Sequence, residues 1–420
     1  MNPSSVWHPF TQHGRGEPIP LVTSASGALL HLADGSRVID GISSWWVTTH
    51  GHCNPRIMQA IADQAGKLDQ LIFAGWTHEP AETVAAGLRQ IMPQSLTRVF
   101  FSDSGSTSVE VALKMALGYW HWRGEAQRSR ILVMEHSYHG DTIGAMSVGE
   151  RGVFNQPYTP LLFDVGRIPF PAQGGEQATY DALEAFCREG TTAALIVEPL
   201  VLGAGGMLFY APEVLAEMRR ICAAHGVLFI ADEVMTGWGR TGTLIACEQA
   251  GIEPDILCLS KGLTGGAVPL AVTMASEPIF EAHWHAEDRA RMFFHSSSYT
   301  ANPLACAAAA ENLAIWREEP VLERISALAR KQADWIDKLG QVYHFDNPRT
   351  CGTIAALDIK VNDEGGYMSD VSPHLQAFFR ERGVLLRPLG NTIYVMPPYC
   401  ITDDELAEVW DAIGEAVIAF

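Results

Sequence analysis

Short, continuously apolar runs recur through the middle of the chain, and polar or amphipathic segments separate them. The runs are RVFF at 98–101, ILVM at 131–134, AALIV at 193–197, VLFIA at 227–231, ILCL at 256–259 and LAVTMA at 270–275. Strands covered on both faces have unbroken apolar sequences, whereas strands with one face in water alternate. The pattern therefore predicts a mostly parallel sheet with helices on both faces, as in an α/β domain.

Helical periodicity occupies several of the intervals between these runs. In the segment 105–120, an apolar stripe forms at helical spacing and consists of Val109, Leu113, Ala116 and Trp120. A second helix is predicted at 213–226, where it ends on a glycine, and two more at 368–382 and 403–419. Strands that alternate with helices favour a parallel sheet.

The two ends of the chain have a different pattern. Residues 27–41 predict two strands joined by a tight turn at Asp34-Gly35, and residues 383–398 resemble a second hairpin. We therefore expect a large α/β domain at 55–305 and a smaller, discontinuous α+β domain built from 1–54 and 306–420.

Composition excludes several classes of partner. The chain has 420 residues, 47% hydrophobic and 18% charged, and a net charge of −19. That charge argues against nucleic acids and anionic membranes, because both require a basic surface. No apolar run reaches the roughly 18 residues of a membrane span, and the N-terminus lacks the pattern of a signal peptide. The eight cysteines are scattered, without a C-x-x-C pair, which favours a reducing, cytoplasmic setting without disulfides or structural zinc.

Candidate chemistry gathers where the predicted strands end, which is where parallel sheets bind ligands. The first segment, at 102–107, is rich in serine and glycine and precedes a helix. It suits either a phosphate site or ordinary helix capping. The second, HSYHGD at 136–141, offers Tyr138 as a neighbour of a ligand, while His136, His139 and Asp141 are an alternative metal cluster.

Asp232 and Glu233 follow the run at 227–231 and precede GWGRTG at 237–242. The glycines match G-x-G-x-x-G formally, but two carboxylates would repel a pyrophosphate there. Asp232 is either a loop aspartate or a partner that keeps a heterocyclic nitrogen protonated.

Lys261 follows the run at 256–259 and lies among glycines. It is either a lysine that extends to the surface or an amine kept accessible for a carbonyl compound. A phosphate site, an acid and a lysine at neighbouring strand ends together suit pyridoxal 5′-phosphate (PLP), in which the ring acts as an electron sink.

The chain resembles the class III, fold-type I PLP aminotransferases from Trp7 to Pro398. The shared motifs are DSGS, YHGDT, IVEP, IADEV-x-TG-x-GRTG, PDILCLSKGLTGG and NPLACAAA. WHPFTQ, DGISSWW, HGDTIGAMSV and RPLGNTIYVMPPY are closer to the aminotransferases of biotin synthesis within that class. The resemblance implies a large domain with a mostly parallel central sheet and a smaller α+β domain.

The resemblance also implies roles for individual residues. Lys261 is expected to form the Schiff base and shuttle the proton, and Asp232 to pair with the pyridinium nitrogen. Tyr138 is expected to be a further catalytic residue that also contacts the cofactor. The other residues expected to hold the cofactor are Gly105, Ser106, Glu198, Ser297 and Ser298. The residues expected to contact substrate are Phe10, Trp45, Trp46, Tyr138, Ser296 and Arg387. The serine segment is expected to reach the neighbouring subunit, which implies a homodimer with shared active sites.

Three functions follow as alternatives. The first is amino transfer from S-adenosylmethionine to 8-amino-7-oxononanoate, which Trp45-Trp46 and the segment 387–399 favour. The second is a class III ω-amino acid or diamine transaminase that uses pyruvate or another keto acid. Phe10, where biotin-synthesis relatives have tyrosine, and the run Ser296–Ser298 favour this one. The third, a non-catalytic protein of the same fold, conflicts with the presence of Lys261 and Asp232.

Overall fold

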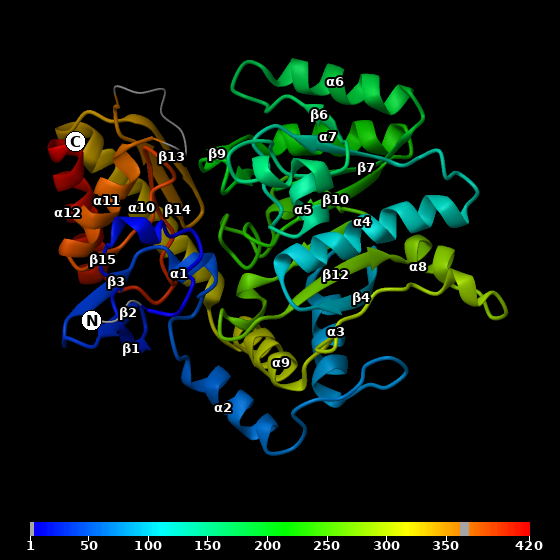
Figure 1. Ribbon diagram of the computed structural model, residues 1–420, viewed down its shortest axis with the longest axis horizontal. Helices are drawn as coiled ribbons and strands as arrows, with labels where there is room; N and C mark the ends of the chain where they lie inside the picture. Colours follow the sequence, from blue (N-terminus) through cyan, green and yellow to red (C-terminus); the bar gives the residue numbers. More distant parts are fainter. Residues whose placement is uncertain (1–3, 362–368) are drawn as a thin grey trace.

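The computed structural model describes residues 4–361 and 369–420. Figure 1 shows the elements from both chain ends grouped on one side and the elements from the middle of the chain on the other. Both termini therefore belong to the same part of the molecule.

A seven-stranded sheet forms the centre of the larger part. Its order is β4 (Leu96–Ser102), β12 (Ala271–Ser276), β11 (Ile256–Leu259), β10 (Leu228–Asp232), β7 (Thr192–Val197), β5 (Arg130–Met134) and β6 (Gly166–Ile168). Only β12 runs antiparallel to its neighbours, so the prediction of a mostly parallel sheet is confirmed. All six predicted strands are present, and the short edge strand β6 was not predicted.

Alternate residues of the central strands pack against opposite layers of helices. Ile131 and Val133 of β5 belong to a buried cluster with α4 (Gly105–Trp122), while Leu132 and Met134 belong to another with α7 (Pro212–Ala224). Burial on both faces explains why these strands are apolar throughout.

The other helices surround this centre or the elements of the chain ends. They are α1 (Ser43–Trp46), α2 (Pro55–Ala65), α3 (Glu79–Ile91), α5 (Ile143–Ser147), α6 (Glu176–Arg188), α8 (Glu277–His283), α9 (Pro303–Glu318), α10 (Val321–Val342), α11 (Val371–Glu381) and α12 (Asp403–Ala419). The predicted helices at 105–120, 213–226 and 403–419 are confirmed. The prediction at 368–382 corresponds to α11, and Met368 lies outside the described residues.

Two further sheets lie among the elements of the chain ends, and the first of them combines strands from both ends. One contains β1 (Val22–Ser26), β2 (Leu29–Leu32), β3 (Arg37–Asp40) and β15 (Val384–Leu385), and the other β13 (Asp346–Cys351), β14 (Ile354–Asp358) and β16 (Thr392–Val395). The predicted hairpin at 27–41 is confirmed as β2 and β3, which pair across Asp34-Gly35. A separate small sheet contains β8 (Val201–Leu202) and β9 (Leu208–Phe209).

The predicted hairpin at 383–398 is wrong. Its first strand, β15, pairs in parallel with β3, whereas its second, β16, pairs with β14 in the other sheet. The chain does turn back at Gly390, where Leu389 and Thr392 form an isolated antiparallel bridge, but this pairing does not extend to β15 and β16.

The predicted domain boundaries stay a prediction. The division between residues 305 and 306 falls inside α9, and α9 packs against α2 and α3. In the described ranges, no helix has both the length and the apolarity that crossing a bilayer requires.

Candidate active site

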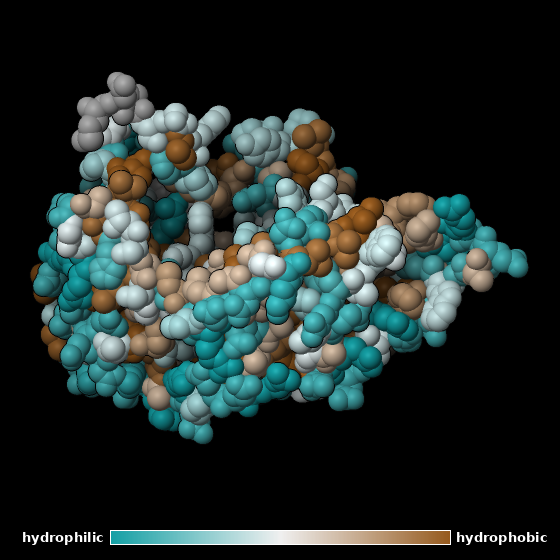
Figure 2. All heavy atoms as spheres, turned by 90° about the horizontal axis from the view of Figure 1, so that it is seen from below, coloured by the Kyte–Doolittle hydropathy of each residue, from teal (hydrophilic) through white to brown (hydrophobic). Residues whose placement is uncertain are grey.

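A cavity of about 190 Å³ lies where five strands of the central sheet end. Figure 2 shows that one face of the molecule is hollowed between the part with the chain ends and the rest. The cavity is lined by residues that follow β4, β5, β7, β10 and β11, together with one residue of α1: Ser104, Gly105, Ser106, Tyr138, His139, Gly140, Glu198, Asp232, Val234, Met235, Lys261 and Trp46. The structure thus brings together most of the predicted site residues, and their roles remain predictions.

Lys261 begins the short 3-10 helix Lys261–Thr264 directly after β11 and Ser260. Its backbone has a φ of 43°, which a non-glycine residue rarely adopts. Its ammonium nitrogen lies 4.9 Å from the centre of the Trp46 ring. Burial lowers the pKa of Lys261 to about 8, although the carboxylates of Asp232 and Glu198 oppose this effect. A substantial share of the amine is therefore neutral near pH 8, as a nucleophile or base requires.

Asp232 ends β10, and its side chain is buried against His139. Asp232 Oδ2 lies 2.7 Å from His139 Nδ1, and Oδ1 accepts a hydrogen bond of 3.1 Å from the Val234 amide. Both groups line the cavity. A carboxylate held in this way keeps a fixed direction and can face a protonated ring nitrogen.

His139 is a site residue that the sequence reasoning treated only as part of an alternative metal cluster. In the described part of the chain, no three histidine, cysteine, aspartate or glutamate side chains gather as metal ligands would. His139 contacts Asp232 instead, while the His136 ring packs against Phe170. The closely spaced histidines and aspartate of HSYHGD were the only indication in the sequence that His139 has a role. They do not show that it contacts Asp232, which lies 93 residues further along the chain.

Glu198 follows β7 and supports the loop that carries Tyr138. Its carboxylate accepts hydrogen bonds from the amides of Tyr138, at 2.9 Å, and Gly203, at 3.0 Å. Burial raises the pKa of Glu198 to about 7, and that of the Tyr138 hydroxyl well above its usual value. The Tyr138 hydroxyl therefore stays protonated at neutral pH and is available to donate a hydrogen bond.

The N-terminus of α4 follows β4 and forms a cradle beside the segments that follow β5 and β10. Ser104 caps the helix by accepting from the Thr107 amide, so the capping interpretation is correct for that residue. Gly105 and Ser106 face the cavity, and a helix N-terminus of this kind favours an anion. The capping interpretation is thus confirmed for Ser104, and the phosphate site at Gly105 and Ser106 stays a prediction.

The cradle depends on small residues. A Cβ atom at Gly140, where φ is 125°, would lie 1.8 Å from Ser106 Oγ, and one at Gly105 would lie 2.7 Å from Val234 Cγ1. Ser106 Oγ in turn accepts a hydrogen bond of 3.0 Å from the Asp141 amide. Glycine at both positions therefore lets the loop after β5 and the segment after β10 lie close to the N-terminus of α4. With Asp232 and Lys261, this set of groups fits PLP.

The predicted substrate residues divide into two groups. Trp46 lines the cavity, whereas Phe10, Trp45 and Arg387 form an outer cluster that does not. The Phe10 and Trp45 rings meet edge to face at 5.4 Å, and the Arg387 guanidinium lies 5.2 Å from the Trp45 ring centre. Arg387 also donates to the Phe10 carbonyl at 3.3 Å, and no carboxylate of the described residues pairs with it.

The predicted serines lie apart from the cavity of their own chain. Ser296, Ser297 and Ser298 are exposed. The Ser297 amide donates to Thr300 Oγ1 at 2.9 Å, and Gln70 donates to the Ser298 carbonyl. Their exposure is compatible with a contact to a neighbouring subunit, which the resemblance implied.

The GWGRTG segment has a structural role that the sequence reasoning missed. Arg240 is buried and donates to the carbonyls of Pro397, at 3.0 Å, Thr48, at 2.9 Å, and Trp46, at 3.4 Å. The segment thus joins the central sheet to the loops that carry Trp46. The sequence around Arg240 does not indicate which backbone carbonyls its guanidinium contacts.

Comparisons with known proteins agree with this geometry. Residues 10–417 match the family described as aminotransferase class-III. A protein from Synechococcus elongatus named adenosylmethionine-8-amino-7-oxononanoate aminotransferase is 48% identical over 98% of this chain and 97% of its own. The crystal structure of the protein of that name from Methanocaldococcus jannaschii has a TM-score of 0.94 at 32% identity, over 99% of this chain and 97% of that one.

A PLP-bound amine transaminase from an uncultivated Pseudomonas species has a TM-score of 0.92 at 32% identity, over 99% of this chain and 98% of that one. Family and fold thus agree over nearly the whole length. The chain belongs to the class III aminotransferases, which are PLP-dependent enzymes.

Proposed function

We propose that the enzyme transfers an amino group from S-adenosylmethionine to 8-amino-7-oxononanoate, giving 7,8-diaminononanoate for biotin synthesis. The observation that carries this proposal is the relative of that name at 48% identity over nearly both full lengths. Other proteins of the same name are 38% and 35% identical over at least 98% of this chain.

The cavity residues suit the binding of PLP in one orientation. Gly105 and Ser106 would hold its phosphate at the N-terminus of α4, and Asp232 would face its ring nitrogen. When bound, PLP supplies an electron sink for the carbon that loses a proton. Lys261 Nζ would bond the cofactor and then carry that proton, a role that its place in the cavity wall and its lowered pKa support, since part of the amine is neutral.

The remaining side chains orient substrate and exclude water. Trp46 and Met235 form apolar parts of the cavity wall. In the outer cluster, Arg387 is available for the carboxylate of 8-amino-7-oxononanoate, since a guanidinium binds a carboxylate through two parallel hydrogen bonds. Trp45 and Phe10 would pack against the aliphatic chain of the same substrate.

A second candidate keeps the cofactor and changes the substrates. Phe10 lacks the hydroxyl of the tyrosine expected there, and an amine transaminase structure matches at a TM-score of 0.92. The enzyme would then be an ω-amino acid or diamine transaminase that uses pyruvate or another keto acid.

Two further properties belong to this proposal. We propose a homodimer in which the exposed segment 296–298 of one subunit reaches the cofactor phosphate of the other. We also propose a cytoplasmic location, because all eight cysteines are unpaired, and five of them are buried.

A panel of amino donors distinguishes the two candidates. The PLP-loaded protein is mixed with S-adenosylmethionine, lysine, a diamine or an ω-amino acid, and the loss of its visible absorbance is followed. The proposal expects S-adenosylmethionine to react fastest, and mass spectrometry to find 7,8-diaminononanoate after 8-amino-7-oxononanoate is added. Rapid reaction with a diamine and pyruvate, without that product, would establish the second candidate instead.

A further inference from the structure

The segment that carries the two tryptophans has an unusual backbone. Within α1, Ser43, Ser44 and Trp46 have φ values of 54°, 60° and 67°. Ser44 also has a ψ of −87°, so the segment is not a regular helix. Non-glycine residues in this region are strained and persist only where their surroundings hold them. Three such residues in four positions therefore require a specific restraint.

A single buried carboxylate restrains Ser44, the second of these residues, while Ser43 Oγ donates to the Met396 carbonyl at 2.8 Å and Arg240 to the Trp46 carbonyl at 3.4 Å. Asp40, at the end of β3, is fully buried. Its oxygens accept hydrogen bonds from the Ser44 amide, at 2.6 and 2.8 Å, from Ser44 Oγ, at 3.1 Å, and from the Ile42 amide, at 3.3 Å. The ring nitrogen Nε2 of His52 lies 2.8 Å from the same carboxylate. Asp40 thus accepts from two groups of Ser44 and from Ile42 directly before the segment, and His52 contacts Oδ2, one of the two oxygens that hold Ser44.

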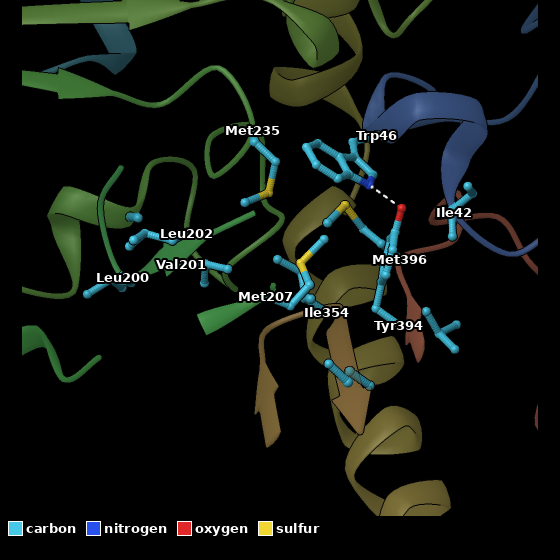
Figure 3. Packing of buried hydrophobic residues seen from close by; sticks show 14 of the residues in the cluster. Ile42, Trp46, Leu200, Val201, Leu202, Met207, Met235, Ile354, Tyr394 and Met396 are labelled. Carbon is cyan, nitrogen blue, oxygen red and sulfur yellow. Dashed lines mark hydrogen bonds between the residues drawn. The ribbon is translucent and has the colours of Figure 1, made fainter. Parts of the chain in front are cut away.

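The segment places consecutive side chains in two parts of the site. The Trp46 ring lies 4.9 Å from Lys261 Nζ, and its indole nitrogen donates to the Tyr394 hydroxyl at 3.0 Å. Figure 3 shows this bond, with Met235 nearby. Trp45 points the other way and meets Phe10 and Arg387 in the outer cluster. An ordinary helical or extended backbone at Ser44 would change both directions at once.

We propose that Asp40 is a positioning residue for substrate recognition, which holds Ser43–Trp46 so that Trp46 faces Lys261 and Trp45 faces Arg387. The proposal rests on the function proposed above, because it takes both tryptophans as substrate contacts. It predicts that loss of the carboxylate weakens substrate binding more than it slows chemistry, since Lys261 and Asp232 are held by other elements.

The test replaces Asp40 by asparagine. Asp40→Asn presents one acceptor and one amide donor where two acceptors are needed, so at least one bond to Ser44 is lost. We expect KM for the keto acceptor to rise roughly 10- to 150-fold, as for other lost hydrogen bonds to a charged group. We expect kcat to change less than about threefold and the visible absorbance of bound PLP to stay unchanged.

Asp255→Asn is the matched control. Asp255 also accepts a backbone amide, that of Phe229 at 2.8 Å, and pairs with a basic side chain, Arg219 at 3.0 Å. It precedes β11, at the end of that strand opposite Lys261. This variant should lower the melting temperature and leave KM unchanged. Equal increases of KM in both variants, or a lower melting temperature for Asp40→Asn with unchanged KM, would show a structural role only and overturn the proposal.

Two further variants keep the test decisive. Asp40→Asn/Ser44→Gly should recover part of the lost affinity, because glycine adopts the backbone of Ser44 without strain. If Asp40→Asn does not fold, Ser44→Ala takes its place, because it removes only the side-chain bond to Asp40. It should raise KM by about 2- to 12-fold. An unchanged KM in Ser44→Ala would then overturn the proposal.

The KM measurements use the amino donor and keto acceptor that the wild-type enzyme prefers in the panel of amino donors described above. If the wild-type enzyme prefers a diamine and pyruvate, KM is measured with those substrates. Failure of the proposed reaction is thus visible in the wild type, whereas failure of the Asp40 proposal is visible only in the variants.

Discussion

At the scale of single residues, Asp232 is the acid whose position most constrains the chemistry. Its neighbour in sequence, Glu233, is equally buried but faces away from the cavity. Glu233 accepts from Thr236 Oγ1 at 2.5 Å and from the amides of Ala246 and Cys247 at 3.0 and 2.8 Å. Two consecutive buried carboxylates thus differ in what they contact, which gives Asp232 a natural control.

Asp232→Asn is expected to retain PLP and lose most of the rate. The cofactor's ring nitrogen would lose its charged partner and become a poorer electron acceptor. The rate constant of the first half-reaction, measured by stopped-flow absorbance, should fall roughly 10- to 150-fold. Glu233→Gln should instead lower stability and leave that rate constant nearly unchanged. An undiminished rate in Asp232→Asn would remove Asp232 from the chemistry.

Arg387→Ala is expected to weaken binding of a substrate that carries a carboxylate. A charge-assisted hydrogen bond contributes roughly 1.5–3 kcal/mol, so kcat/KM for 8-amino-7-oxononanoate should fall about 10- to 150-fold. The kcat/KM for the methyl ester of the same compound shows whether the lost contact is to the carboxylate, because the variant should no longer distinguish acid from ester. Arg382→Ala, which removes an arginine paired with Glu415, is the control. Retained discrimination in Arg387→Ala would show that the carboxylate binds elsewhere.

Site residues that lie at the ends of strands could be predicted from the sequence. Residues whose partners lie in distant segments of the chain could not. Lys261 and Asp232 were predicted because each lies within two residues of the end of an apolar run. His139, Arg240 and Asp40 were not assigned their contacts, because their partners lie in segments that only the folded chain brings near. Phe10 and Arg387 were predicted to contact substrate, but they lie in an outer cluster that pattern alone does not separate from the cavity.

At the scale of elements, long or fully buried segments were predictable and short connections were not. The hydrophobic pattern is consistent along the whole length of the elements that were predicted, which include β5, β7, β10, β11, α4, α7 and α12. The short strand β6 and the connection between β15 and β16 depend on which sheet edges are available for pairing in the folded chain. The local sequence pattern does not show this. The hairpin at 383–398 was wrong for that reason.

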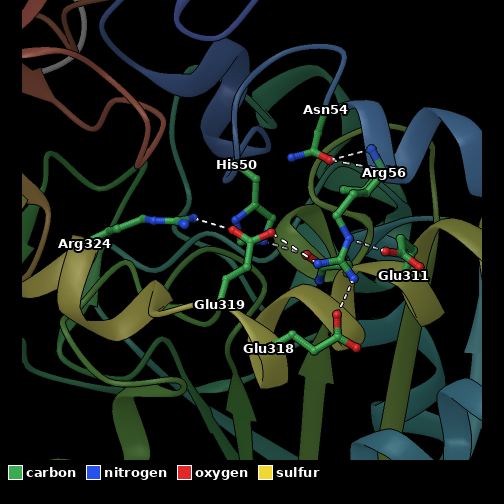
Figure 4. Close-up of polar contacts among 9 residues, drawn as sticks. His50, Asn54, Arg56, Glu311, Glu318, Glu319 and Arg324 are labelled. Atoms are coloured by element: carbon green, nitrogen blue, oxygen red, sulfur yellow. Dashed lines mark hydrogen bonds and ion pairs between the residues drawn. The ribbon is translucent and has the colours of Figure 1, made fainter.

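Helices α2 and α9 are joined by a polar network, and a separate set of hydrogen bonds from α9 holds the loop of Lys261. Figure 4 shows Arg56 of α2 between Glu311, Glu318 and Glu319, with Arg324 on Glu319. Beside this network, His50 Nε2 lies 2.9 Å from Asn312 Oδ1. The Asn312 amide donates to the carbonyls of Gly262 and Leu263, at 3.0 Å each. The backbone that follows Lys261 is therefore held from α9.

His50 predicts a pH dependence of stability. Burial lowers its pKa from 6.5 to about 4. The unfolded chain therefore binds a proton that the folded chain does not, and stability rises with pH between these two values and is lost as pH falls through them. At about pH 4.5 the loss should reach roughly 2 to 3 kcal/mol relative to pH 7.

The measurement compares urea unfolding of the wild type and His50→Gln at about pH 7 and pH 4.5. Glutamine keeps a donor for Asn312 but does not titrate, so the variant should lose less stability on acidification by that amount. Equal losses in both proteins would mean that His50 is not held neutral in the folded state.

At the scale of the whole molecule, the active site lies between segments that are far apart in the sequence. The cavity combines the ends of five central strands with Trp46, and Arg240 joins the central sheet to the loops that follow α1 and β16. The fold class and the family were predictable from motifs spread over nearly the full length. The association of two subunits depends on surfaces of a second chain and stays a proposal.

The central claim is that Lys261 is the residue that bonds the cofactor. The direct measurement reduces the PLP-loaded protein with borohydride, which fixes the cofactor to the amine that holds it, and locates the modified peptide by mass spectrometry. The account predicts a single modification on Lys261, and none in Lys261→Ala, whose transaminase activity should be lost as well. Modification of another lysine in the wild type, or an active and still modified Lys261→Ala protein, would contradict it.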